Sequence, residues 1–386
     1  MWLTLLSIIY GVLISLDPIL FVFIGYSLNA TGFYLGLLSA VWSIAYIVAS
    51  KLLNRVADEG YNKLLALLTL ACLAASYICF RSLNYVTAIL SYTMHAVSIA
   101  SINLAVSVTI LECTDSDLWY SSSVLQRSLS SFSRGFTLLF ISFRGIASIH
   151  NLFWLSFLLT TVSLPLLPSI SLSFERRFYR LSRNLNELGM YIKASSSILF
   201  LDKPAVARHV FNTSWEKGSS ISLYRVLLSI AIATALGDYI FAVLPLILRE
   251  HMALNTVWIA YGVASLFSAA IVVIFKDFSV SRRSFTIFVM VLRICILVLG
   301  LSIVRDLASL TTYIILSSLL YLLVDVTLYN MFIEASAGFS TANYFTFREI
   351  GSIIGSLIGG MAIGFGRDVF LGLAAVIGSS AILILI

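Results

Sequence analysis

The chain has 386 residues, of which 60% are hydrophobic and only 11% are charged. A soluble domain carries about 25% charged residues, so this composition excludes an ordinary water-soluble protein and indicates a lipid bilayer as the surroundings. The net charge of +6 does not indicate nucleic-acid binding, because the basic residues lie in segments between the apolar runs, where they set orientation in a membrane.

Long apolar segments recur along the whole chain. A helix that spans a bilayer needs about 20 mostly apolar residues, and a strand with an open edge cannot satisfy its backbone hydrogen bonds in lipid. In the first half we expect spans at 2–26, 33–53, 64–80, 86–111, from about 123, and 152–170. In the second half we expect spans at 221–248, 257–275, 285–304, 310–333, 342–364 and 369–386. The sequence therefore predicts an all-α polytopic membrane protein with twelve transmembrane helices.

A polar segment, 173–219, separates the two apolar halves and holds eight of the 24 Lys and Arg residues. We therefore expect an N-terminal six-helix bundle at 1–172, a central loop at 173–219 and a C-terminal six-helix bundle at 220–386. Cytoplasmic loops of membrane proteins carry an excess of Lys and Arg. The central loop and both termini are thus expected in the cytoplasm of a multi-pass protein of the cell membrane.

The two halves repeat their polar residues at a nearly constant distance along the chain. Four pairs are separated by 221 or 222 positions: Asp17 and Asp238, Asn103 and Asp325, Glu112 and Glu334, Arg127 and Arg348. This register predicts two homologous six-helix halves related by a twofold axis along the membrane normal. In the span at 342–364, glycines 351, 355 and 359 lie four positions apart and predict close helix packing.

Six plus six spans around a cytoplasmic central loop is the architecture of the major facilitator superfamily of secondary transporters. Residues 54–63, Asn-Arg-Val-Ala-Asp-Glu-Gly-Tyr-Asn-Lys, resemble the signature G-x-L-x-D-R-x-G-R-K of that superfamily, with Asp58 on its aspartate and Lys63 on its terminal base. Both arginines of the signature are replaced, by Glu59 and Asn62. Tyr92 stands near the place of an arginine that many proton-driven exporters of the superfamily carry. The resemblance implies two bundles that rock about a central cavity.

Two aspartates lie deep inside predicted spans that face the cavity in the superfamily. Asp17 is followed by Pro18, which removes a backbone donor, and Asp238 has Thr234 one helical turn away as a candidate partner. A charged side chain at the centre of a bilayer costs about 2.5–3.5 kcal/mol on insertion scales. Each aspartate is therefore a candidate site for a proton or a cationic group; the alternative is a polar packing residue.

Three further residues are assigned to the same pathway. Asp325 is a candidate for proton or substrate binding, whereas Asn103 is as easily explained by hydrogen bonding between helices. Arg134 is the cation expected in the pathway, either as a counter-ion to an aspartate or as a contact for an anionic substrate group; a structural salt bridge explains it equally well. Arg293 could snorkel to the membrane surface and is given no role.

The resemblance also implies a cytoplasmic gate, in which acids and bases at facing helix ends form salt bridges that break when the cavity opens. The residues assigned to this gate are Asp58, Glu112, Arg127, Glu334 and Arg348.

The sequence favours a secondary active transporter that moves a small solute by alternating access, coupled to protons. The alternative is a membrane receptor or scaffold that uses the same fold without transport. The sequence has no HExxH, phosphate-binding glycine loop or nucleophile elbow, so we expect no enzyme activity, cofactor or metal. The expected partners are a small solute, protons and the lipid bilayer, and the expected state is a monomer.

Overall fold

The computed structural model describes residues 2–113, 119–145, 148–167, 222–274, 283–336 and 341–385. The regular structure of these ranges is helical. The first half comprises α1 (Trp2–Ser27), α2 (Gly32–Asp58), α3 (Asn62–Arg81), α4 (Tyr85–Cys113), α5 (Trp119–Arg144) and α6 (Ser148–Leu166). The second half comprises α9 (Leu223–Phe241), α10 (Leu244–Arg249), α11 (Leu254–Ile274), α12 (Arg283–Ile303), α13 (Leu307–Ser336), α14 (Thr341–Ala362), the short 3₁₀ helix η2 (Ile363–Phe365) and α15 (Arg367–Leu385).

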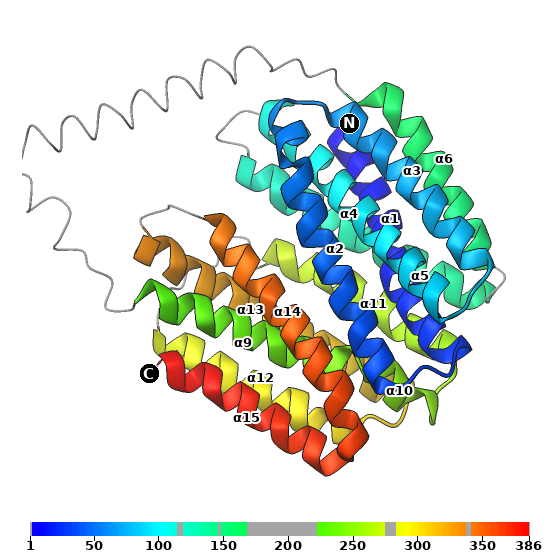
Figure 1. The fold of residues 1–386 in the computed structure, drawn as a ribbon. Helices are drawn as coiled ribbons and strands as arrows, with labels where there is room; N and C mark the ends of the chain where they lie inside the picture. Colours follow the sequence, from blue (N-terminus) through cyan, green and yellow to red (C-terminus); the bar gives the residue numbers. More distant parts are fainter. Residues whose placement is uncertain are drawn as a thin grey trace, which may run out of the picture.

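The helix boundaries repeat as the polar residues do. Helix α2 begins at Gly32 and α11 at Leu254, and helix α4 begins at Tyr85 and α13 at Leu307, which are both offsets of 222 residues. With α9 and α10 counted as one broken span, the described helices make six spans in each half, arranged as two bundles (Figure 1). The prediction of twelve helices in two similar halves is confirmed. The proposed domain boundaries near 172 and 220 lie outside the described residues.

The span expected at 221–248 is found at Leu223–Arg249, with a two-residue turn inside it at 242–243. Helix α9 ends at Phe241 and α10 begins at Leu244, with Pro245 in its first turn. Proline has no N–H to donate to the carbonyl four residues earlier, but it is well tolerated at the start of a helix. Pro245 therefore ends one helix and starts the next, whereas Pro18 lies inside α1 without ending it.

Among the described helices, nine are long and apolar enough to cross a membrane by length and composition. Three of the twelve expected spans do not meet this measure. In α6 the apolar stretch, Ile149–Pro165, is short. Helices α5 and α14 are long enough but carry more polar residues, and each packs against a helix of the other half: α5 against α11, and α14 against α2. Their polarity is therefore explained by burial between the bundles.

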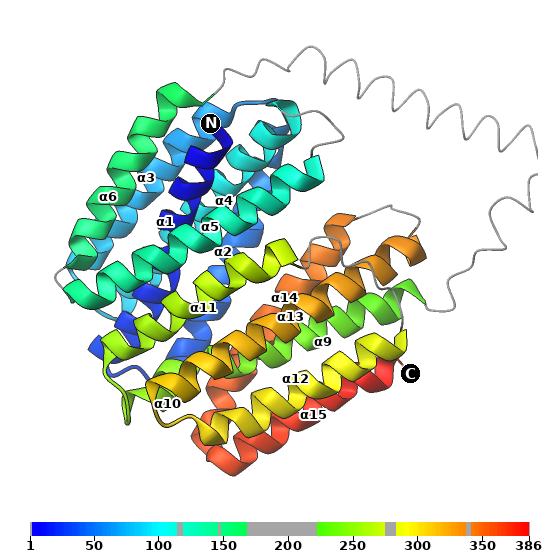
Figure 2. The same cartoon turned by 180° about the vertical axis from the view of Figure 1, so that it is seen from behind.

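Small residues allow α2 and α14 to approach closely. A Cβ atom at Gly36 would lie 2.4 Å from the carbonyl oxygen of Ser356, and one at Gly360 would lie 2.6 Å from that of Gly32. Further along the same two helices, the hydroxyls of Ser43 and Ser352 are 3.0 Å apart and hydrogen-bonded. On the other side of the molecule α11 lies alongside α5, where Ser128 donates a hydrogen bond to the carbonyl of Ala269 (Figure 2).

The two bundles meet most closely at one end of the molecule. There, Tyr26 donates to the carbonyl of Met252 at 3.1 Å, and Arg249 donates to the carbonyl of Gly25 at 3.3 Å. Both contacts join the end of α1 to the turns around α10. Toward the opposite end, where both chain termini lie, the bundles diverge (Figure 1).

Within the second half, the glycines of α14 pack on the backbone of α9. A Cβ atom added at Gly351 would lie 2.0 Å from the carbonyl oxygen of Ala231, and one added at Gly355 would lie 2.1 Å from that of Ala235. Gly359 lies equally close to the carbonyl of Tyr239. The close packing expected from this glycine spacing is confirmed.

Candidate functional site

Asp17 is the centre of a polar cluster between the two halves. It lies midway along α1, and the hydroxyl of Tyr92 on α4 donates a hydrogen bond to its Oδ1 at 2.5 Å. Arg134 on α5 is close enough for its charge to act on both Asp17 and Tyr92. Both charges also act on Tyr261 of α11, which belongs to the second half. The structure thus brings together two residues that the sequence analysis assigned to the pathway, Asp17 and Arg134.

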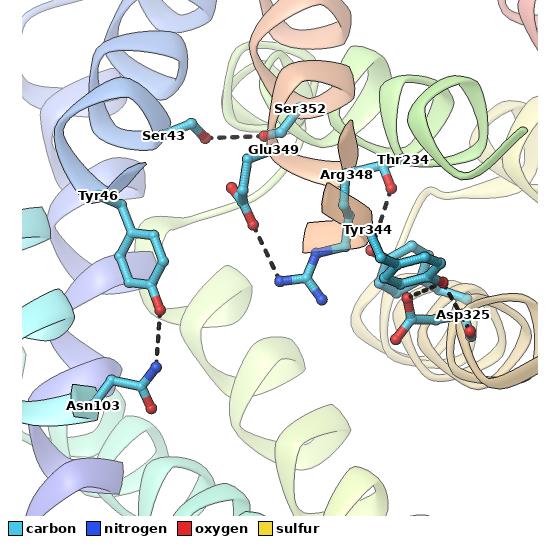
Figure 3. Close-up of polar contacts among 10 residues, drawn as sticks. Ser43, Tyr46, Asn103, Thr234, Asp325, Tyr344, Arg348, Glu349 and Ser352 are labelled. Atoms are coloured by element: carbon cyan, nitrogen blue, oxygen red, sulfur yellow. Dashed lines mark hydrogen bonds and ion pairs between the residues drawn. The ribbon is translucent and has the colours of Figure 1, made fainter. Parts of the chain in front are cut away.

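Aromatic rings form one side of this cluster. The ring of Tyr92 lies 5.8 Å from that of Phe21 and 6.3 Å from that of Trp42. Trp42 is stacked on Tyr46 with ring centroids 5.4 Å apart, and Asn103 donates to the Tyr46 hydroxyl at 2.9 Å (Figure 3). Asn103 therefore reaches the site through Tyr46 of α2.

Two buried hydrogen-bond donors near Asp17 have no partner in the described part of the protein. They are Nε1 of Trp42 and Nε of Arg134. Most buried polar groups in proteins are hydrogen-bonded, and an exception calls for an explanation such as a bound ligand or water. The first-half cluster therefore combines a carboxylate, a guanidinium and aromatic rings with two unsatisfied donors.

Asp238 occupies the corresponding place in the second half, on α9. Its hydrogen-bonding neighbour is the hydroxyl of Ser352 on α14, which in turn contacts Ser43 of the first half. The expected partner Thr234 instead lies 3.4 Å from the hydroxyl of Tyr321 (Figure 3). Asp238 is thus one side chain away from the contact between α2 and α14.

Arg293 lies inside the protein and does not snorkel. Its side chain is buried, with 5% of the residue exposed, and Nη1 donates to the carbonyl of Ala233 at 2.7 Å. The guanidinium lies over the ring of Tyr321, 4.6 Å from the centroid. Nη2 occupies the space beside Gly237, where a Cβ atom would be 2.6 Å away. The inward orientation depends on this glycine, a relation between two helices that the sequence does not reveal.

Asp325 and Arg348 lie at the diverging end of the second bundle. The hydroxyl of Tyr344 donates to Oδ1 of Asp325 at 3.0 Å, and the guanidinium of Arg348 lies 3.1 Å from the carboxylate of Glu349 (Figure 3). The charge of Arg348 also acts on Asp325. The partners of both residues come from α14, next to α13 in the same half.

The gate residues are only partly described. Arg127 is exposed on the first part of α5, and Arg348 is paired with Glu349. The side chains of Asp58, Glu112 and Glu334 lie outside the described residues, so the proposed acid–base latch stays a prediction. In the described ranges, no three His, Cys, Asp or Glu side chains gather as they would around a metal ion.

Several residues near the two aspartates were not predicted as site residues: Trp42, Tyr46, Tyr261, Arg293 and Ser352. Arg293 carried the strongest available signal, since a charge inside an apolar span usually faces the bundle interior.

Solved transporter structures resemble this fold over nearly its whole length. The crystal structure of a mutant of the nucleoside transporter NupG superposes with a TM-score of 0.65 at 12% identity, covering 99% of this chain and 98% of that one. A structure reported for substrate recognition in proton-dependent oligopeptide transporters gives 0.67 at 14% identity, covering 99% and 95%. The xylose transporter XylE from E. coli, in a partially occluded inward-open conformation, gives 0.61 at 14% identity, covering 99% and 97%.

No protein-family model matches the sequence. No curated protein matches it either. The structural likeness, together with the helical architecture, shows that this is a multi-pass membrane protein with the fold of the major facilitator superfamily transporters.

Proposed function

We propose that this protein is a secondary active transporter that moves a small solute across the cell membrane by alternating access, coupled to protons. The observation that carries the proposal is the cluster of Asp17, Tyr92 and Arg134 at the junction of the two halves. Opposite charges held inside a membrane protein are costly, and they mark substrate or proton pathways when they face a bundle interior. The comparison with transporters of nucleosides, oligopeptides and xylose supports a small polar solute.

The arrangement of the bundles supports alternating access. The halves contact each other at the end of α10 through Tyr26 and Arg249 and diverge at the end that carries the termini (Figure 1). Rocking about the contacts of α2 with α14 and of α5 with α11 would expose the central cluster first to one side and then to the other. With the termini in the cytoplasm, the end at which the bundles diverge would face the cell interior (Figure 1).

Proton coupling is proposed because three carboxylates lie within the spans: Asp17, Asp238 and Asp325. Such a group can take up a proton while it faces one side and release it on the other. Asp17 and Asp238 occupy equivalent places in α1 and α9, and Asp238 hydrogen-bonds Ser352, which contacts Ser43 of the other half. Arg134 would balance the charge of Asp17, and Arg127 and Arg348 would belong to the gate.

Transport by the purified protein in liposomes tests the proposal. Nucleosides, short peptides, sugars and amino acids would be screened with and without a proton gradient. We expect at least one solute to accumulate above equilibrium only when the gradient is present. If no solute enters faster than into protein-free liposomes, the receptor or scaffold alternative is favoured instead.

A further inference from the structure

A pocket that contains two charged side chains lies in the second half, between α9, α12 and α13. Its volume is about 150 Å³, and its lining includes Gly237, Asp238, Arg293, Ser317, Ser318 and Tyr321. An engineered cavity of about this size in another protein holds a benzene molecule, so this pocket has room for a small organic solute. We call it the second-half pocket.

Two opposite charges line this pocket without contacting each other. The ion pairs among the described residues include none between Asp238 and Arg293. Asp238 has its contact with Ser352, and Arg293 has its contacts with Ala233 and Tyr321. The other charges that act on Asp238 from α14, Arg348 and Glu349, are paired with each other.

Two donors in the lining have no partner among the residues that the structure describes. Nε of Arg293 and the hydroxyl of Ser317 are both buried without a hydrogen bond. Their residues are 5% and 2% exposed. A buried donor without a partner costs about 1–3 kcal/mol, so two of them beside an empty volume indicate that an acceptor belongs there. Asp238, which lines the same pocket, can only accept hydrogen bonds while it is ionised.

We propose that the second-half pocket binds the charged groups of a small zwitterion, an amino acid or a related compound. Its carboxylate accepts hydrogen bonds from Arg293 and Ser317, and its ammonium group donates to Asp238. A solute with a single charge satisfies only one side of the pocket and leaves the opposite charge unpaired. The pocket is also close to the contact between the halves, because Asp238 contacts Ser352, which contacts Ser43 of the other half.

The inference rests on the proposed function in one respect: it takes this zwitterion to be the transported solute. Binding itself can be measured without transport.

Ligand-dependent thermal stability of the full-length protein in detergent tests the proposal. L-Alanine and γ-aminobutyrate serve as zwitterions with different spacings, and propionate and ethylamine serve as singly charged controls. Since a ligand that binds only the folded state raises its stability, we expect at least one zwitterion to raise the melting temperature, and neither control to do so at the same concentration.

Three variants assign the effect to the pocket. Arg293→Gln and Asp238→Asn should each weaken zwitterion binding by at least about tenfold, the factor that corresponds to 1.4 kcal/mol. Ser317→Ala removes a single hydroxyl and remains informative if a charge variant fails to fold. Arg81→Gln, at the exposed end of α3, and Ser379→Ala, on the exposed side of α15, are the matched controls and should bind as the parent does.

The proposal is overturned if neither zwitterion stabilises the parent protein, or if the three pocket variants bind as tightly as the parent. It is also overturned if propionate or ethylamine alone stabilises the protein as well as the zwitterions do. If a proton gradient drives the uptake of some other solute and no zwitterion binds, this inference is wrong and the proposed transport function stands.

Discussion

At the scale of single residues, the partly buried carboxylate of Asp17 accepts a hydrogen bond from the hydroxyl of Tyr92. Among the described residues, Tyr92 donates the hydrogen bond that Asp17 receives from another helix. The charge of Arg134 acts on Asp17, but the ion pairs of the described residues include none between them. In the described part of the protein, Nε of Arg134 and Nε1 of Trp42 have no hydrogen-bond partner. These two donors could therefore bind a solute beside Asp17.

Replacing Tyr92 with Phe should destabilise the protein and alter transport. The substitution removes the donor and leaves a partly buried acceptor without this hydrogen bond, which costs at most about 1–3 kcal/mol. Thermal unfolding of the purified variant measures the loss, with the exposed Tyr61→Phe as the control. An unchanged melting temperature together with unchanged uptake would show that the hydrogen bond has no role.

Asp306 lies in the turn before α13, outside the spans. It accepts hydrogen bonds from the backbone N–H of Ser309 at 2.8 Å and from its hydroxyl at 2.6 Å. These bonds favour the ionised form and lower the pKa of Asp306 below its usual value. Because the folded-state pKa is lowered, the contribution to stability is present above the unfolded pKa of about 3.9 and is lost as the pH falls through the folded value.

We therefore expect Asp306→Ala to lower the melting temperature slightly at neutral pH and not at strongly acidic pH. Asp306→Asn keeps the capping acceptor and should retain most of the stability while losing the dependence on acid. Melting temperatures from acidic to neutral pH check this. Equal losses for Asp306→Ala at both ends of the range would contradict it.

At the scale of the helices, the packing of α14 on α9 leaves no room for side chains at its glycines. A Cβ atom at Gly355 would lie 2.1 Å from the carbonyl oxygen of Ala235, whereas one at Gly372 of α15 would have no described atom within 4 Å. Overpacking typically costs about 1–3 kcal/mol. Gly355→Ala should thus lower the melting temperature and Gly372→Ala should not. Equal effects of the two substitutions would argue against the close packing.

Much of the helical layout could be predicted from the sequence, because the lengths of the apolar segments and the constant offset between polar residues can be read without knowing how the helices pack. The break before Pro245 was missed, although proline itself was the available signal. The contacts of Asp17 with Tyr92 and of Arg293 with Tyr321 could not be predicted. They depend on how each helix is rotated, and helices that are apolar on every side give no such information.

At the scale of the whole molecule, the orientation in the membrane is a further prediction. In a variant without its four native cysteines, Ser195→Cys in the central loop should resist an impermeant thiol reagent added to intact cells. Arg305→Cys, in the exposed turn between α12 and α13, should react. In the proposed topology, the central loop and the turn between α12 and α13 lie on opposite sides of the membrane. Labelling of Ser195→Cys and not of Arg305→Cys would reverse the orientation.

The whole account depends on coupling between protons and solute through the central carboxylates. Substitution of Asp17 or Asp238 by Asn keeps shape and hydrogen bonding and removes the ability to carry a proton. Both variants are expected to insert and fold, and both should lose accumulation driven by a proton gradient. Exchange of solute down its gradient should survive in at least one of them, and Asp17→Asn is the one expected, because Asp238 is assigned to the zwitterion.

The most direct measurement is therefore solute uptake by Asp17→Asn in proteoliposomes, compared with the parent protein with and without a proton gradient. The account predicts that the variant equilibrates the solute and fails to concentrate it. If Asp17→Asn concentrates solute as the parent does over a range of pH, Asp17 is a packing residue and the proposed coupling is wrong.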